Sequence, residues 1–93
     1  MKIVINNCYG HYSLSAAACA ILGVESQWAF ENDRDAEALV EVVEEFGEEA
    51  NGRYAKLIVI EIPDEATDWE IFEYDGMEEV VYVLNGKLYH VCH

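Results

Sequence analysis

Flexible and membrane-spanning segments are scarce in this sequence. Its 93 residues include one proline and six glycines, too few for a long flexible linker. No apolar stretch approaches the roughly 20 residues that a membrane-spanning helix needs. We therefore expect a single compact domain over residues 1–93 that does not enter a membrane.

Basic residues are also few. Five lysines and arginines face nineteen aspartates and glutamates, which gives a formal net charge of −14. Because nucleic acids and anionic membranes are negatively charged, this excess argues against direct binding to either. It favours a positively charged partner surface or cations. A disordered acidic segment is excluded too, because 53% of the residues are hydrophobic and 12% are aromatic.

Acidic residues are absent from both ends of the chain. All nineteen lie between Glu25 and Glu79, and that segment has only three basic residues. Residues 1–24 and 80–93 contain no acid. We therefore expect the two ends to share the core and the middle of the chain to carry the charged surface.

An even set of cysteines is missing as well. Cys8, Cys19 and Cys92 are an odd number, whereas small secreted scaffolds normally carry paired cysteines. Residues 1–6 have the pattern of a short strand and not of a secretory leader. Both observations favour reduced thiols in a cytoplasm.

Thiol and imidazole groups gather near both ends of the chain. Cys8 and His11 lie near the start, and His90, Cys92 and His93 lie at the end. Such groups bind zinc, and the two sets would meet if the first strand lay beside the last. The C-x-x-H and H-x-C-H spacings are not those of common zinc fingers, however, and terminal residues tend to fray. We expect no bound metal and no cofactor, with a zinc site as the alternative.

Hydrophobic periodicity predicts two helices and five strands. The strands are expected at residues 2–6, 55–62, 69–74, 80–84 and 87–91, and the first helix at residues 16–22. The second helix is expected to begin at 33 or 35, to kink or end at Gly47, and to stop in any case at Asn51-Gly52. Residues 55–62 are apolar on both faces, which is typical of a central strand. The order β-α-α-β-β-β-β predicts an α+β fold, in which a mostly antiparallel sheet of about five strands has two helices packed on one face.

Local signals mark the ends of these elements. Ser13 or Ser15 offers an N-cap for the first helix, which is apolar nearly all round and is therefore expected to be buried. Asp33 or Asp35 is expected to begin the second helix. Near the C-terminus, Asn85-Gly86 suits a type I′ turn. That turn would place Tyr82 opposite Tyr89 and Val81 opposite His90.

The second helix has two opposite faces. Its apolar side chains recur with helical spacing at Ala36, Leu39, Val40, Val43 and Phe46. The other face carries the side chains that we call the acidic stripe: Glu37, Glu41, Glu44, Glu45 and Glu48. The stripe would be roughly 16 Å long with a carboxylate about every 5–6 Å, a spacing comparable to that of phosphates along a DNA strand. It is either a face that only confers solubility or a phosphate-like surface that occupies a nucleic-acid-binding groove.

A second acidic segment follows Pro63 and surrounds three aromatic residues. Its acids are Asp64, Glu65, Asp68, Glu70, Glu73, Asp75, Glu78 and Glu79, and the aromatic residues are Trp69, Phe72 and Tyr74. Interfaces favour aromatic anchors. We therefore add Asp64, Glu65, Asp68 and Trp69 to the acidic stripe as expected partner-binding residues. The alternative is that Trp69 belongs to the core and the acids decorate loops.

No constellation in the sequence marks a catalytic site. Cys8 with His11 is the one candidate for a thiol nucleophile, and the negative charge of the protein disfavours a thiolate. No glutamate is distinguished from the other acids as a general acid or base. We therefore expect a binding protein and not an enzyme.

Two stretches resemble a family of small phage-encoded proteins. Residues 1–15, MKIVINNCYGHYSLS, are similar to a family opening that usually reads KIVIN-x-CYGGFSLS. Residues 51–80, NGRYAKLIVIEIPDEATDWEIFEYDGMEEV, are similar to its second half, ANG-x-x-AKL-x-VVEIPDG-x-x-WEI-x-EYDG-x-E. The sequence departs from the family at His11, where a glycine is usual, and in residues 80–93, where relatives end in a polar tail.

The small size, the acidity and the phage-like motifs also resemble the anti-CRISPR proteins, several of which imitate DNA. This resemblance implies that the protein acts in the cytoplasm of a bacterial host. Separately, we expect it to be a monomer. It would bind a basic DNA-binding surface of a multi-subunit CRISPR surveillance complex and block target DNA, without binding nucleic acid itself. The alternative is a phage accessory module that binds another protein through its acidic and aromatic segment.

Overall fold

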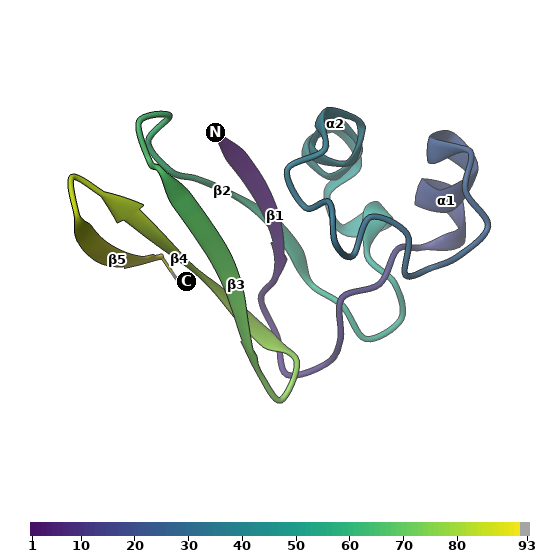
Figure 1. Ribbon diagram of the computed structural model, residues 1–93. Helices are drawn as coiled ribbons and strands as arrows, with labels where there is room; N and C mark the ends of the chain where they lie inside the picture. Colours follow the sequence, from purple (N-terminus) through teal and green to yellow (C-terminus); the bar gives the residue numbers. More distant parts are fainter. Residues whose placement is uncertain (92–93) are drawn as a thin grey trace.

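A computed structural model describes residues 1–91, and its elements follow the predicted order (Figure 1). They are β1 (Lys2–Asn6), α1 (Ala16–Leu22), α2 (Glu37–Phe46), the 3₁₀ helix η1 (Gly47–Ala50), β2 (Leu57–Glu61), β3 (Asp68–Tyr74), β4 (Met77–Leu84) and β5 (Lys87–Val91). The predicted α+β class and element order are confirmed. None of the helices in the described residues is long and apolar enough to cross a membrane.

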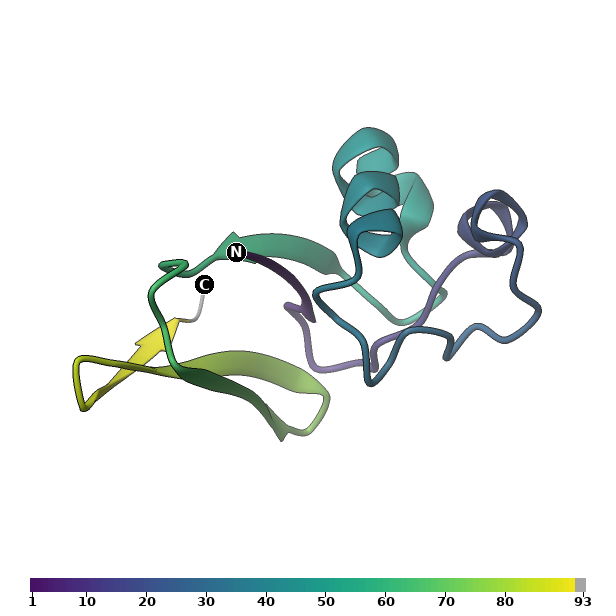
Figure 2. The same ribbon diagram turned by 45° about the horizontal axis from the view of Figure 1, so that its top comes forward.

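The prediction of one five-stranded sheet is wrong, because the strands divide into two antiparallel sheets. β1 pairs with β2, and β4 lies between β3 and β5 in the second sheet. Figure 2 shows the second sheet on one side of the β1-β2 pair and the helices on the other.

The alternating side chains of β1 explain this division. Val4 packs into the core that contains α2, whereas Ile3 and Ile5 pack into a second core with Val80 of β4. A two-stranded sheet with apolar residues on both faces needs cover on both faces, and the helices supply only one layer. The central position expected for residues 55–62 is wrong, because β2 is shorter and pairs with β1 alone, although its apolar side chains do pack on both faces, into both cores.

The helices form successive layers and do not both lie on the sheet. α2 buries Leu39, Val40 and Val43 of the predicted apolar face against β1 and β2. α1 packs against α2 and η1, and only Ala18 and Cys19 of its side chains are buried. The expectation that α1 is buried all round is therefore wrong, because only one of its faces has a neighbour.

Local signals fixed some helix ends and not others. The Ser15 hydroxyl accepts a hydrogen bond from the backbone N–H of Ala18, which confirms the predicted N-cap of α1. The expected start of α2 at Asp33 or Asp35 is wrong, since the N-cap position is Ala36 and no side chain caps the helix. The chain before Ala36 instead forms a series of tight turns, including one in which Ala36 N–H donates to the Asp33 carbonyl.

The last hairpin has the predicted register. Tyr82 pairs with Tyr89 and Val81 with His90, and the two tyrosine rings stack with centroids 5.3 Å apart. Asn85 and Gly86 have φ angles of 53° and 77°, which a type I′ turn requires. Local turn chemistry was sufficient to predict this part of the fold.

Residues 1–15 and 51–80 meet at Asn6, the last residue of β1. The buried Asn6 amide donates to the Gly76 carbonyl at 2.8 Å, and its oxygen accepts from Lys56 N–H at 2.8 Å. Asn6 therefore ties the end of β1 to the start of β2 and to the turn between β3 and β4. Gly76 also packs so closely on Gly10 that a Cβ atom would lie 1.4 Å from the Gly10 carbonyl oxygen.

Candidate functional site

A buried ion pair lies between the helical side of the protein and β4. The Arg34 guanidinium donates two hydrogen bonds to the Glu78 carboxylate, at 2.7 and 2.8 Å, and both side chains are buried. Arg34 also donates to the Glu31 and Val4 carbonyls, and Glu78 accepts from Asn6 N–H. Because every polar atom of this pair has a partner, the charges are tolerated in the core.

Tyr12 lies beneath this ion pair. The Arg34 guanidinium carbon is 3.8 Å from the centre of the Tyr12 ring, a cation–π arrangement. The Tyr12 hydroxyl donates to the Ala29 carbonyl at 2.6 Å. Burial raises the pKa of this hydroxyl well above its usual range, so Tyr12 stays neutral and acts as a structural donor.

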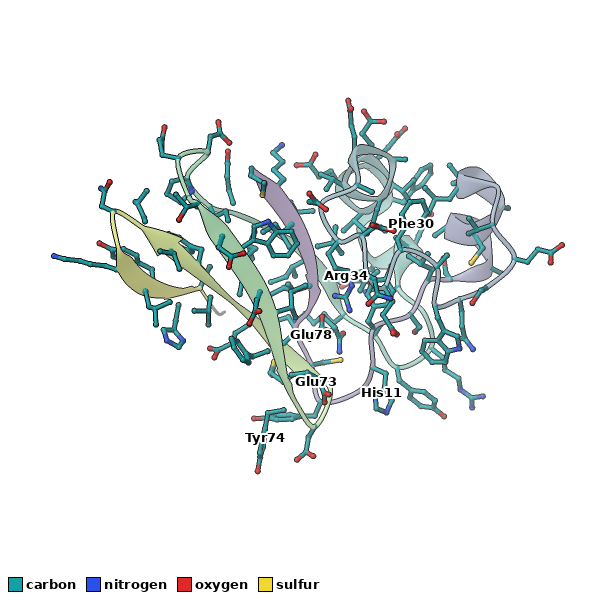
Figure 3. The ribbon with its side chains drawn as sticks, in the orientation of Figure 1. His11, Phe30, Arg34, Glu73, Tyr74 and Glu78 are labelled. Carbon is teal, nitrogen blue, oxygen red and sulfur yellow. The ribbon has the colours of Figure 1, made fainter. Side chains whose placement is uncertain are left out.

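A groove of about 760 Å³ borders the ion pair, and Arg34 and Glu78 form its floor. Trp28 and Glu31 line it from the loop between α1 and α2, and Ile71 and Glu73 line it from β3. His11 comes from the loop after β1. In Figure 3, His11 lies toward the helices and Glu73 toward β3, with Arg34 and Glu78 above them in the view.

The groove continues along β3. A second depression shares Glu31, Arg34 and Ile71 with the first and is bordered by Trp69 and Glu70. The combined hollow, which we call the central groove, thus has a tryptophan near each end and glutamates along its rim. Trp28 is 47% exposed, whereas Trp69 is half-buried against the second core.

The acidic stripe is exposed, but it is not one continuous helical row. Glu37, Glu41 and Glu45 follow one another at intervals of four residues on α2. Glu48 lies on η1, which begins at Gly47, so the stripe runs from α2 onto a separate 3₁₀ helix. Glu44 is paired with Lys2 of β1 at 2.8 Å, an interaction that raises the pKa of the lysine.

The second set of expected binding residues is divided between the surface and the core. Asp64 forms an ion pair with the N-terminal amine, whose hydrogen bond lowers the pKa of this carboxyl group. Glu65 is exposed, and the Asp68 carboxylate accepts a hydrogen bond from Trp69 N–H. The Trp69 side chain packs on the second core, in agreement with the alternative that Trp69 belongs to the core.

The outer face of the second sheet is another exposed surface with aromatic side chains. Phe72, Tyr74 and Leu88 are each more than half exposed there. Glu79 and His90 lie on the same sheet, 3.4 Å apart. This face combines exposed aromatic and apolar side chains, which interfaces favour, with acidic ones.

The proposed zinc ligands fall partly outside the described residues, because Cys92 and His93 do. The Cys8 thiol donates to the Tyr54 carbonyl at 3.2 Å and lies near the Asn6 side chain. Within residues 1–91, no three or more cysteine, histidine or acidic side chains are grouped closely enough to hold a metal ion.

Sequence analysis missed Arg34 and Trp28 and treated Glu78 as one surface acid among many. One signal was available for Arg34, since it is one of only three bases in the acidic segment. Nothing in the sequence indicated which acid it would meet.

Comparisons with protein-family models, with curated proteins and with solved structures find no match to this chain.

Proposed function

We propose that this protein binds a basic, nucleic-acid-binding surface of a bacterial CRISPR surveillance complex and competes there with target DNA. The proposal rests above all on the exposed carboxylates of α2. All but two of the nineteen acidic side chains are exposed, and Glu37, Glu41 and Glu45 have no basic partner among the described residues.

Rigid placement makes these carboxylates suitable as a substitute for phosphates. Leu39, Val40 and Val43 anchor α2 in the core, so the opposite face keeps its spacing without help from a partner. Glutamates four residues apart on a helix lie about 6 Å from one another. Arginine and lysine side chains that hold a DNA backbone would find comparable charge at comparable intervals.

The choice of a CRISPR complex as the target rests on the resemblance to small phage proteins and to anti-CRISPR proteins. A −14 charge disfavours direct contact with DNA, so the inhibitor would act on the protein side of the complex. The site of action would be the cytoplasm of the bacterial host, and the inhibitor would act as a monomer without a cofactor.

A pair of charge reversals tests the role of α2. The variant with Glu41→Lys and Glu45→Lys should fold normally and lose at least about tenfold in inhibition of target DNA binding. The control carries Glu25→Lys and Glu61→Lys, which change the net charge equally at exposed positions outside the acidic stripe. The control should inhibit as the parent does, and binding by the parent should weaken steeply with salt.

Two results would contradict the proposal. Full inhibition by the folded Glu41→Lys and Glu45→Lys variant would leave the acidic stripe as a solubility feature only. Submicromolar binding of the purified protein to duplex DNA in a gel shift would show that the protein recognises DNA directly and does not mimic it.

The outer face of the second sheet supports an alternative function as a protein-interaction module unrelated to nucleic acids. Its exposed Phe72 and Leu88 line one shallow hollow with Val81 and Val83, and contiguous apolar surface of this kind marks interaction sites. Under this alternative, Phe72→Ser with Leu88→Ser would abolish partner capture, and the charge reversals on α2 would leave it unchanged.

A further inference from the structure

We propose that the central groove receives an arginine side chain from an extended basic segment of the protein partner. This inference rests on the proposed function and adds a second contact site to the face of α2. The two adjoining hollows of the groove have volumes of about 760 and about 270 Å³, and their walls come from two layers of the fold.

The charge of the groove favours a cation. Glu31, Glu70 and Glu73 border it, and within the described residues neither Glu31 nor Glu70 has a basic partner for its carboxylate. Glu73 accepts a hydrogen bond from Gly76 N–H with one oxygen, which leaves the other available. The positive charge of Arg34 at the floor is already matched by Glu78.

The aromatic side chains favour a guanidinium over an ammonium as the bound cation. Trp28 exposes about half of its surface at one end of the groove, beside Glu31. A planar guanidinium stacks on an aromatic ring while its N–H groups bind carboxylates, whereas an ammonium offers only a point charge. The floor shows the same combination inside the protein, where Arg34 stacks on Tyr12 and binds Glu78 with two hydrogen bonds.

The floor also fixes the shape of the groove. The Arg34–Glu78 pair joins the loop that carries Trp28 and Glu31 to the sheet that carries Ile71 and Glu73. A site whose walls are held together before binding loses less entropy when a ligand enters. The groove is therefore a preformed site, which favours the binding of a guanidinium without rearrangement of its walls.

A capped peptide with the sequence Gly-Gly-Arg-Gly-Gly tests the site without the partner complex. Titration of the ¹⁵N-labelled protein should give saturable NMR shifts of the Trp28 indole N–H and of the Glu31 and Glu73 amides. The same peptide with citrulline, which is neutral but of similar shape, should bind at least about fivefold more weakly. Equal binding of the two peptides would overturn the inference.

Variants separate the groove from general attraction to an acidic protein. Trp28→Ala, and Glu31→Gln combined with Glu73→Gln, should each weaken peptide binding at least about threefold. The Glu73→Gln side chain keeps an oxygen that can accept from Gly76 N–H, so the turn should be preserved. The control combines Glu49→Gln with Glu61→Gln, which remove two exposed charges elsewhere and should leave binding unchanged. Equal weakening by the control would mean that net charge, and not the groove, attracts the peptide.

An assay with the surveillance complex distinguishes this inference from the proposed function. If the groove variants inhibit fully while Glu41→Lys with Glu45→Lys does not, the proposed function stands and the groove inference fails. If the peptide binds the groove as described but no variant affects a CRISPR complex, the groove binds arginine and the proposed target is wrong.

Discussion

Arg34 and Glu78 are 44 residues apart in the sequence, and they form a buried ion pair with two hydrogen bonds of 2.7 and 2.8 Å. The pair connects the loop before α2 with β4, which belong to different layers of the fold. The chain has five bases and nineteen acids. Through this pair, one of the few bases is buried in the core and forms part of the central groove.

Removal of one partner of this pair should be strongly destabilising. We expect Glu78→Gln to lower the free energy of unfolding by about 3–5 kcal/mol, because it leaves the Arg34 charge buried without a counterion. The neighbouring Glu79→Gln, at a half-buried position near His90, should cost less than about 1 kcal/mol. Urea unfolding curves of the two variants provide the comparison.

A double variant tests whether the cost arises from the unpaired charge. Arg34→Met with Glu78→Gln should be less destabilised than the sum of the two single variants, since neither charge remains in the core. Additive losses would show that Arg34 and Glu78 stabilise the protein independently of one another.

Two glycines in similar turns should respond very differently to alanine. Gly76→Ala should prevent folding or cost more than about 4 kcal/mol, because the new methyl group would overlap the Gly10 carbonyl. Gly86→Ala should cost only about 1–2 kcal/mol, since its φ of 77° is unfavourable but the space around it is open. Thermal unfolding by circular dichroism distinguishes the two, and equal losses would contradict the close packing at Gly76.

Asp64 should contribute to the pH dependence of stability. The N-terminal amine lowers the pKa of Asp64 in the folded protein below its usual value near 3.8. The contribution is therefore fully present above that value and is lost as the pH falls through the folded-state pKa. We expect the parent to be more stable than Asp64→Asn at pH 6 and equal to it near pH 2, as measured by urea unfolding.

A matched variant and a modified terminus check this assignment. Glu65→Gln removes an adjacent exposed charge and should not show the same pH-dependent difference. Acetylation of Met1 removes the positive charge that Asp64 binds, so it should abolish the difference between the parent and Asp64→Asn. A difference that survives acetylation would assign the effect to another group.

Salt should stabilise the protein. The exposed carboxylates repel one another, and this repulsion weakens as the ionic strength rises from about 20 to about 200 mM. We expect the melting temperature to increase over this range in sodium chloride. A steady decrease would mean that the ion pairs of Lys2 and of the N-terminal amine outweigh the repulsion.

The parts of the fold that depend on neighbours in the sequence were predictable. The apolar face of α2, the Ser15 cap and the register of Tyr82 with Tyr89 each follow from side-chain period or turn chemistry over a few residues. The start of α2 was not predictable in this way, because the turns before Ala36 hold the chain through backbone contacts and not through an aspartate cap.

The sequence by itself determined the class of the fold, the order of its elements and the acidity of its surface. Periodicity and composition carry that information locally. Only the tertiary structure decided that the strands form two sheets, that Glu78 is buried while its neighbours are not, and that Trp28 and Glu73 border one groove. These features depend on which distant segments meet, and many pairings are compatible with the same local pattern. The packed core stabilises the one observed, because this arrangement covers both faces of β1 and β2 and gives Arg34 a counterion.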